Sequence, residues 1–182
     1  MILVTGGSAS GKSEYAEQLI AERGRGQRVY IATMRVWDEE SEERIRKHRR
    51  MRRQKQFATI ECYSGLDSLD LAACVPVGLT AAKDPAFSVL LECMSNLAAN
   101  EIYECGGSSD EIIGRIMAGI RELKKQAETL IIVTNEVFSD DGDYDPQTRS
   151  YLNILGELNQ QLAKLAGEVT EVVYGIPVTI KK

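Results

Sequence analysis

The sequence has 182 residues, 43% of them hydrophobic, and a formal net charge of −5 at pH 7, which predicts a single domain over residues 1–182 with a packed core. No apolar run is long enough for a membrane span, no signal-peptide pattern precedes the first apolar run, and the acidic balance argues against stable nucleic-acid binding. The four cysteines lack Cys-x-x-Cys spacing, which argues against a zinc knuckle or a redox motif and favours reduced thiols in a cytoplasmic protein.

The first predicted element leads into a phosphate-binding motif. A short apolar run, Ile2–Val4, reads as a buried strand, and Gly-x-x-x-x-Gly-Lys-Ser follows it directly before a helical pattern. Glycines let backbone N–H groups point at phosphate oxygens, and the helix directs its positive end at the same anion. Lys12 can reach the β and γ phosphates, and the Ser13 hydroxyl can bind Mg²⁺. The predicted phosphate site consists of Gly6, Gly7, Ser8, Ala9, Ser10, Gly11, Lys12 and Ser13.

Strand-like runs then alternate with helical patterns, which favours an α/β fold of the P-loop NTPase type with a mostly parallel sheet flanked by helices. The expected strands are Ile2–Thr5, Val29–Thr33, Ala58–Cys62, Ser88–Leu91, Leu130–Thr134, Thr170–Tyr174 and Ile176–Ile180. We expect the last two to form an antiparallel hairpin through Gly175. Apolar stripes predict helices at Ser13–Glu22, Ser108–Gln126 and Pro146–Leu165, and Ser64–Phe87 reads as a loop-rich excursion.

A charged arm, about residues 38–56, is expected to protrude from this domain. Its helical part, Asp38 to about Arg53, begins acidic and ends basic, an order that suits the helix dipole. Only Ile45 and Met51 are apolar in its body, too few to bury a face. The expected i,i+4 ion pairs are Glu40–Arg44, Glu42–Arg46 and Glu43–Lys47.

The only histidine of the sequence, His48, lies in this arm, with Arg44 and Arg52 on the same helical face. Crowded cations disfavour the imidazolium, and a neutral imidazole is a nucleophile. Arginines, in turn, suit phosphate oxygens. From the residues alone, an incidental histidine on a solvated charged helix remains the competing interpretation.

Further motifs follow in a characteristic order along nearly the whole chain. They are Ile2–Ser13, Tyr30–Thr33, Arg44-Ile-x-x-His48, Thr59–Glu61, Leu90–Cys93, Val133–Val137, Arg149, Gly156, Asn159–Gln160, Leu162–Ala163 and Gly175. In this order they resemble the bifunctional adenosylcobinamide kinase/adenosylcobinamide-phosphate guanylyltransferase family of cobalamin biosynthesis. A P-loop alone would match many proteins, whereas the ordered set matches few.

The resemblance implies two reactions at one phosphate site: phosphorylation of adenosylcobinamide by ATP or GTP, and transfer of GMP from GTP, through guanylylated His48, to adenosylcobinamide phosphate. It also implies a homotrimer that acts on a corrinoid substrate. Lys12 and His48 are the expected catalytic residues, and Ser13 and Glu92 the expected Mg²⁺ ligands. The further expected nucleotide contacts are Thr33, Met34, Arg35, Arg49, Arg52, Glu61 and Glu92.

The sequence departs from the family pattern in four places, which leave the nucleotide core intact and concern contacts expected to face the corrinoid. Phe138 stands where the family pattern has a glycine, and Asp145-Pro146 stands where it has Val-Pro. An Arg-Pro pair of the pattern is represented only by Arg52 or Arg53, without the proline, and Tyr151-Leu152-Asn153 replaces Phe-Arg-Asp.

Two alternatives stay open: a simple small-molecule kinase, and a regulatory GTPase or nucleic-acid-stimulated ATPase. A simple small-molecule kinase would use the basic arm as a phosphate lid and form no covalent GMP adduct. A regulatory GTPase would carry Asn-Lys-x-Asp, but the comparable segment is Thr134–Val137, without the lysine. A nucleic-acid-stimulated ATPase would depend on the basic arm alone, against an acidic total.

Overall fold

Strands and helices alternate along the chain as expected. The computed structural model describes residues 1–36, 38–39, 42–43, 45–46, 50, 55–75, 86–138 and 142–182. The strands are β1 (Ile2–Thr5), β2 (Gln27–Ala32), β3 (Ala58–Glu61), β4 (Phe87–Glu92), β5 (Thr129–Val133), β6 (Glu168–Val173) and β7 (Ile176–Lys181). The helical elements are α1 (Lys12–Arg23), η1 (Leu66–Ser68), α3 (Leu71–Cys74), α4 (Met94–Asn100), the π-helical η2 (Glu101–Cys105), α5 (Ser109–Gln126) and α6 (Pro146–Leu165).

The described strands form one seven-stranded sheet in the order β3-β2-β4-β5-β1-β6-β7. Every neighbouring pair is parallel except β6 and β7, which pair antiparallel. Their hairpin turns at Tyr174 and Gly175, which have φ of +51° and +78°, the left-handed conformation that tight two-residue hairpin turns require. The predicted parallel sheet with a C-terminal hairpin is therefore confirmed.

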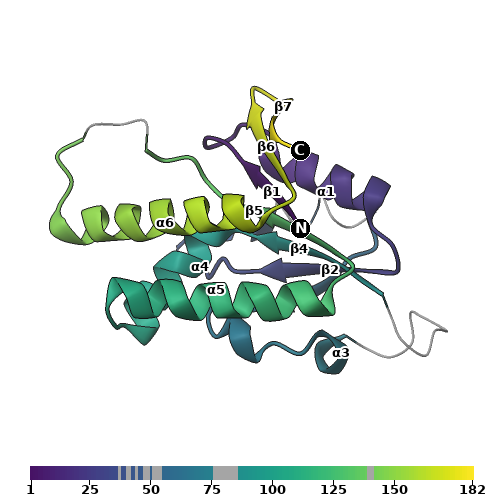
Figure 1. The fold of residues 1–182 in the computed structure, drawn as a ribbon, viewed down its shortest axis with the longest axis horizontal. Helices are drawn as coiled ribbons and strands as arrows, with labels where there is room; N and C mark the ends of the chain where they lie inside the picture. The colour runs from purple at the N-terminus through teal and green to yellow at the C-terminus, as the bar shows by residue number, and fades with distance from the viewer. Residues whose placement is uncertain are drawn as a thin grey trace.

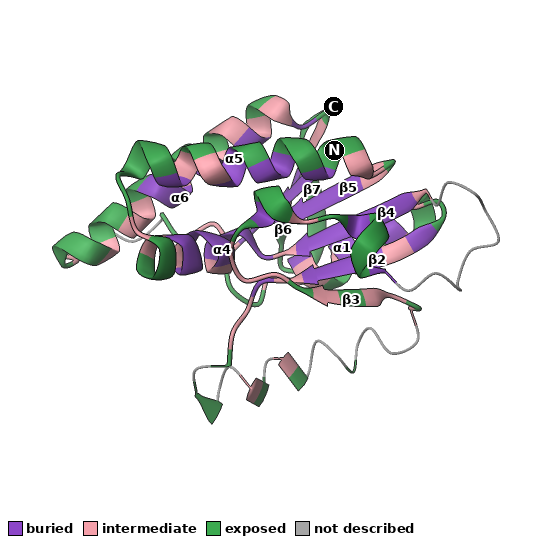
Figure 2. Ribbon diagram, turned by 90° about the horizontal axis from the view of Figure 1, so that it is seen from below, coloured by how far each residue is buried: buried purple, intermediate pink, exposed green. Residues whose placement is uncertain are grey.

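Both faces of the sheet are buried, because side chains alternate along each strand. In β1, Leu3 packs into the core on one face and Val4 into the core on the other. Helix α1 covers the Val4 face, while α4, α5 and α6 cover the Leu3 face (Figure 1). The inner strands are accordingly buried along most of their length (Figure 2). Such burial explains their near-continuous apolar sequences.

The long helices have the boundaries that capping chemistry predicts. Ser108 caps α5, and Glu111 completes a capping box by accepting the Ser108 N–H at 2.8 Å. Helix α6 begins at Pro146 behind Asp145, whose carboxylate accepts the N–H groups of Gln147 and Thr148. No helix among the described residues is long and apolar enough to cross a bilayer.

Two stretches of the chain contain helical elements that were not expected. Helix α4 and η2 were not predicted, because α4 is buried on nearly every side and so lacks an amphipathic stripe. The expected loop-rich excursion contains η1 and α3, the latter capped by the Asp70 carboxylate. Strand ends also shift by one or two residues: β2, for example, begins at Gln27 and ends at Ala32.

The arm is described in part. Its described helical residues are Glu39, Glu42, Glu43, Ile45, Arg46 and Arg50. The expected Glu42–Arg46 ion pair is present at 2.7 Å. The other two expected pairs include residues outside the described ranges.

Candidate active site

The phosphate-binding loop lies between β1 and α1, at the carboxyl edge of the sheet. Gly6 (φ +153°) and Gly11 (φ +91°) have backbone conformations that suit glycine, and Ala9 between them has φ of +56°. A Cβ on Gly6 would lie 2.5 Å from the Val172 carbonyl oxygen. The hairpin also supports the loop, because the Gly175 N–H donates to the Ser10 carbonyl at 2.8 Å. This loop, Gly6–Ser13, is the cradle, and it has the tight strand-to-helix backbone that its spacing predicts.

Lys12 lies inside this loop instead of extending into solvent. Its Nζ donates to the Gly7 carbonyl at 2.9 Å, and the residue is only 7% exposed. Burial lowers the pKa of Lys12, while the neighbouring Cys93 and Glu92 act in the opposite direction. A desolvated ammonium interacts strongly with an incoming anion. Lys12 is therefore placed to bind a phosphate in the cradle.

Ser13 and Glu92 meet although they are far apart in the sequence. Ser13 Oγ, at the start of α1, donates to Glu92 Oε1, at the end of β4, at 2.5 Å. A hydroxyl and a carboxylate beside a phosphate cradle are the oxygen donors that Mg²⁺ takes from proteins when phosphates supply its other ligands. The two side chains expected to hold the metal therefore lie in contact with each other.

Thr33 has a different position from the one expected. It is fully buried, and its Oγ1 donates to the carbonyls of Glu92 and Cys93 and accepts the Cys93 N–H at 2.7 Å. The Glu92–Cys93 peptide that it holds is cis. The Thr33 hydroxyl therefore supports the Glu92–Cys93 peptide, and the nucleotide contact expected of Thr33 stays a prediction.

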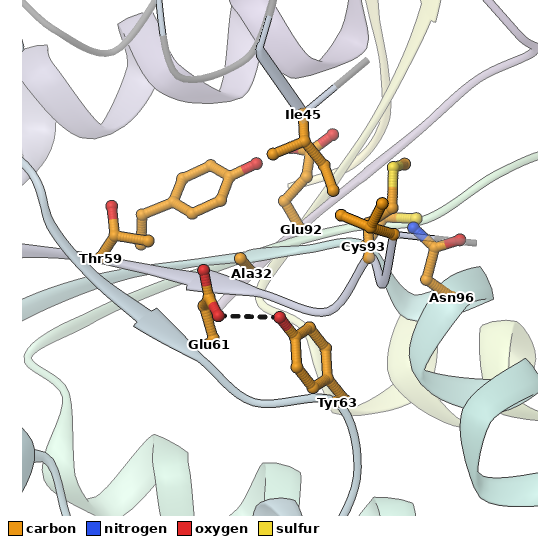
Figure 3. A pocket seen from close by; sticks show the side chains of 11 residues that line it. Ala32, Ile45, Thr59, Glu61, Tyr63, Glu92, Cys93 and Asn96 are labelled. Carbon is orange, nitrogen blue, oxygen red and sulfur yellow. Dashed lines mark hydrogen bonds between the residues drawn. The ribbon is translucent and has the colours of Figure 1, made fainter. Parts of the chain in front are cut away.

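A cavity of about 190 Å³ opens next to the cradle, over β2, β3 and the end of β4 (Figure 3). Glu92 belongs both to its lining and to the Ser13 pair. Glu61 also lines the cavity and accepts the Tyr63 hydroxyl at 2.8 Å. The residues that line the cavity are Tyr30, Ala32, Met34, Val36, Ile45, Thr59, Glu61, Tyr63, Glu92, Cys93 and Asn96. The cavity thus combines apolar walls with carboxylates.

Two residues that follow β2 differ in position. Met34 lines the cavity, and its contact with a nucleotide stays a prediction. Arg35 pairs with Glu104 at 2.6 Å and lies over the Tyr63 ring, with Cζ 4.7 Å from its centroid. Arg35 therefore braces Tyr63 in the cavity wall.

The contacts of Asn100 were not predicted, because its partners lie in the chain after two different strands. The Asn100 amide donates to the Thr33 and Tyr63 carbonyls, both at 2.9 Å, and so joins the chain after β2 to the chain after β3. Asn135 donates to Ser95 Oγ at 2.6 Å. A polar residue within a short helix, such as Asn100 in α4, gives no signal of such a role without the topology.

Phe138, one of the departures from the family pattern, packs against α6. A Cβ on Gly156 would lie 3.6 Å from the Phe138 ring. Phe138 remains 42% exposed. That distance is an ordinary van der Waals contact, so the Phe138 ring, in the loop between β5 and α6, packs over Gly156 without requiring a glycine there.

Three expected site residues, His48, Arg49 and Arg52, lie outside the described ranges. Their arm does reach the site, because Ile45 lines the cavity above Glu92 and Cys93 (Figure 3).

Comparison with known proteins now identifies the family. The family described as cobinamide kinase / cobinamide phosphate guanyltransferase matches residues 2–180. The chain belongs to this family. It is 36% identical to the bifunctional adenosylcobalamin biosynthesis protein CobU of Escherichia coli, over 100% of this chain and 99% of that protein. The CobU protein of Salmonella typhimurium is 35% identical with the same coverage, and the CobP protein of Pseudomonas aeruginosa is 31% identical over 98% of this chain and 96% of that protein.

A solved structure supports the fold. The flagellar accessory protein FlaH of Methanocaldococcus jannaschii superposes with a TM-score of 0.50 at 14% identity, covering 99% of this chain and 77% of that one. At this identity the likeness concerns the fold alone. Membership in the cobinamide kinase / cobinamide phosphate guanyltransferase family makes the chain an enzyme with kinase and guanylyltransferase chemistry, as its motifs predicted.

Proposed function

We propose that this chain carries out two successive transfers at the cradle. In the first, the aminopropanol hydroxyl of adenosylcobinamide attacks the γ-phosphorus of ATP or GTP. The new P–O bond forms as the bond to the nucleoside diphosphate breaks, and the hydroxyl proton is released. Lys12 and the loop N–H groups position and neutralise the phosphates, the main requirement of phosphoryl transfer.

In the second transfer, a His48 ring nitrogen attacks the α-phosphorus of GTP. A P–N bond forms and pyrophosphate leaves. A phosphate oxygen of adenosylcobinamide phosphate then attacks the same phosphorus, breaks the P–N bond and gives adenosylcobinamide-GDP with free His48. Two displacements replace one difficult transfer, as in other covalent catalysis. Arg49 and Arg52 would contact the phosphates.

The observation that carries this proposal is the shared position of Glu92. It belongs to the metal donor pair and to the cavity lining, so one nucleotide could place its phosphates in the cradle and its base in the cavity. Ile45, three positions before His48 in the sequence, lines the same cavity. This position of Ile45 supports the proposal, because it puts a residue of the arm at the cavity in which we place the base.

Ser13 and Glu92 would hold Mg²⁺, whose charge would stabilise the phosphate oxygens during both transfers. We expect Glu92→Gln to lower both activities by about 10²-fold at about 1 mM Mg²⁺, because a neutral amide binds the ion more weakly. Titration with Mg²⁺ should restore part of the activity. Equal Mg²⁺ dependence in the variant and the wild type would contradict the assignment.

Glu61 would select guanine. A carboxylate offers only acceptors, which match the N1–H and 2-amino donors of guanine and not the adenine edge. We expect Glu61→Gln to lower kcat/KM for GMP transfer by about 10²-fold and to narrow the preference for GTP over ITP, which lacks the 2-amino group. Tyr63→Phe is the matched control, because it removes the donor to Glu61 and keeps the carboxylate. An unchanged GTP/ITP ratio in Glu61→Gln would place the base elsewhere.

The proposal is tested by incubating the protein with Mg²⁺ and either α- or γ-labelled GTP. The α label should remain on the denatured protein in an acid-labile form, and adenosylcobinamide phosphate should discharge it. The γ label should leave as pyrophosphate. If neither label is retained, the simple kinase becomes the better explanation.

We also propose that the chain acts in the cytoplasm as a homo-oligomer, with a trimer expected from the family resemblance. The exposed edge strand β7, where Ile176, Val178 and Ile180 all exceed 40% exposure, offers a surface for subunit contact. Light scattering would measure the mass.

A further inference from the structure

A fully buried carboxylate joins the phosphate-loop helix to the base of the arm. Glu17 lies on α1 and is 0% exposed. Its Oε2 accepts Lys55 Nζ at 2.7 Å, and Lys55 is the residue at which the described chain resumes after the arm helix. A buried carboxylate is costly unless it is paired, so this contact constrains both partners strongly.

Further contacts fix the chain at the same point. Arg28, on β2, donates to the Lys55 carbonyl at 3.1 Å and to the Ala21 carbonyl of α1 at 3.2 Å. Two residues later, Phe57 packs edge-on against Tyr30, with ring centroids 6.1 Å apart. The Lys55 side chain, the Lys55 carbonyl and the Phe57 ring thus all attach the C-terminal end of the arm to α1 and β2.

This attachment lies outside the phosphate-binding residues and the cavity, so it can affect the position of the arm without contacting the reacting groups. Glu17 follows Lys12 and Ser13 on the same helix, one turn beyond the phosphate-binding residues. Neither Glu17 nor Lys55 is among the residues that line the cavity. The described contacts therefore fix the end of the arm relative to α1, the helix that follows the phosphate-binding loop.

We propose that Glu17 and Lys55 are positioning residues for GMP transfer: their ion pair holds the base of the arm at a fixed distance from the cradle and so sets how closely His48 approaches the α-phosphorus. This inference rests on the proposed function. Phosphorylation of adenosylcobinamide needs the cradle and the metal but no attack by His48. Loss of the pair should therefore separate the two activities, because small displacements of a nucleophile cost much rate.

The test uses full-length Lys55→Met and Glu17→Gln, together with the double variant, which leaves no unpaired charge. Lys55→Arg keeps a cation for Glu17 and is the conservative rescue. Lys125→Met is the matched control, because Lys125 also pairs with a glutamate at 2.6 Å, but on the exposed face of α5. Each protein is assayed for single-turnover labelling by α-labelled GTP and for steady-state phosphorylation of adenosylcobinamide with ATP.

We expect labelling to slow by on the order of tenfold or more in the neutral variants, with the kinase kcat within about twofold of wild type. Lys55→Arg and Lys125→Met should label at nearly the wild-type rate. Wild-type labelling in the folded double variant would overturn the inference, and so would an equal fall of both activities. If the wild-type protein itself never retains the α label, the proposed GMP transfer through His48 is wrong, and Glu17 and Lys55 have no nucleophile to position.

Discussion

Replacing Lys12 by methionine is expected to lower phosphoryl transfer and GMP transfer together, each by about 10²- to 10³-fold. Lys12 Nζ lies inside the loop, where it donates to the Gly7 carbonyl, and the side chain is nearly inaccessible to water. In such surroundings an ammonium stabilises phosphate charge far more than it would in solvent. Because we place both reactions in one cradle, neither should escape the loss. Steady-state assays of both reactions measure it.

The loss of activity should not reflect unfolding, because the buried charge of Lys12 does not stabilise the folded protein in the absence of ligand. Burial lowers its pKa, so the unfolded chain binds more protons between that lowered pKa and the usual value of 10.5. The free energy of unfolding of the unliganded wild type therefore gains a contribution that rises with pH in this window, and Lys12→Met lacks it. Urea titrations over this range compare the two slopes. Loss of only one activity would indicate separate phosphate sites.

The glycine-rich loop and the contact between Ser13 and Glu92 were predictable from sequence because each depends on one strong local signal. The spacing of Gly6, Gly11, Lys12 and Ser13 defines the loop without knowledge of the rest of the fold. Glu92 ends an apolar strand, and the carboxyl ends of parallel strands share one edge, where β1 also delivers the loop. The 2.5 Å contact between Ser13 and Glu92 is thus the outcome of a topology that alternating patterns already indicated.

Contacts that depend on side-chain direction across strands could not be predicted in this way. Thr33 follows β2 as expected, but its hydroxyl turns inward to the Glu92–Cys93 peptide. The bracing of Tyr63 by Arg35 requires β3 beside β2, an order that sequence does not reveal. The Glu17–Lys55 pair was hidden for the same reason, since a glutamate on an amphipathic helix is usually exposed. Such contacts become visible only once the sheet order is known.

His48→Ala is expected to abolish retention of the α label of GTP and to lower GMP transfer by about 10⁴-fold or more, because no other imidazole exists in the sequence to form the P–N bond. Phosphorylation of adenosylcobinamide by ATP should continue, since the cradle and the Ser13–Glu92 pair are untouched. Denaturing gels measure the label, and digestion followed by mass spectrometry locates it.

The same variant decides between the covalent route and the lid function of the simple kinase. A lid contributes binding, so its loss would raise KM for nucleotide in the kinase reaction, whereas loss of a nucleophile leaves that KM nearly unchanged. His48→Gly offers a sharper test, because added imidazole can accept GMP from GTP in the space of the missing ring and pass it to adenosylcobinamide phosphate. Recovery of adenosylcobinamide-GDP with imidazole would place the lost function at the ring nitrogen. Full labelling of His48→Ala on another peptide, for example at a lysine of the arm, would instead assign the nucleophile to that residue.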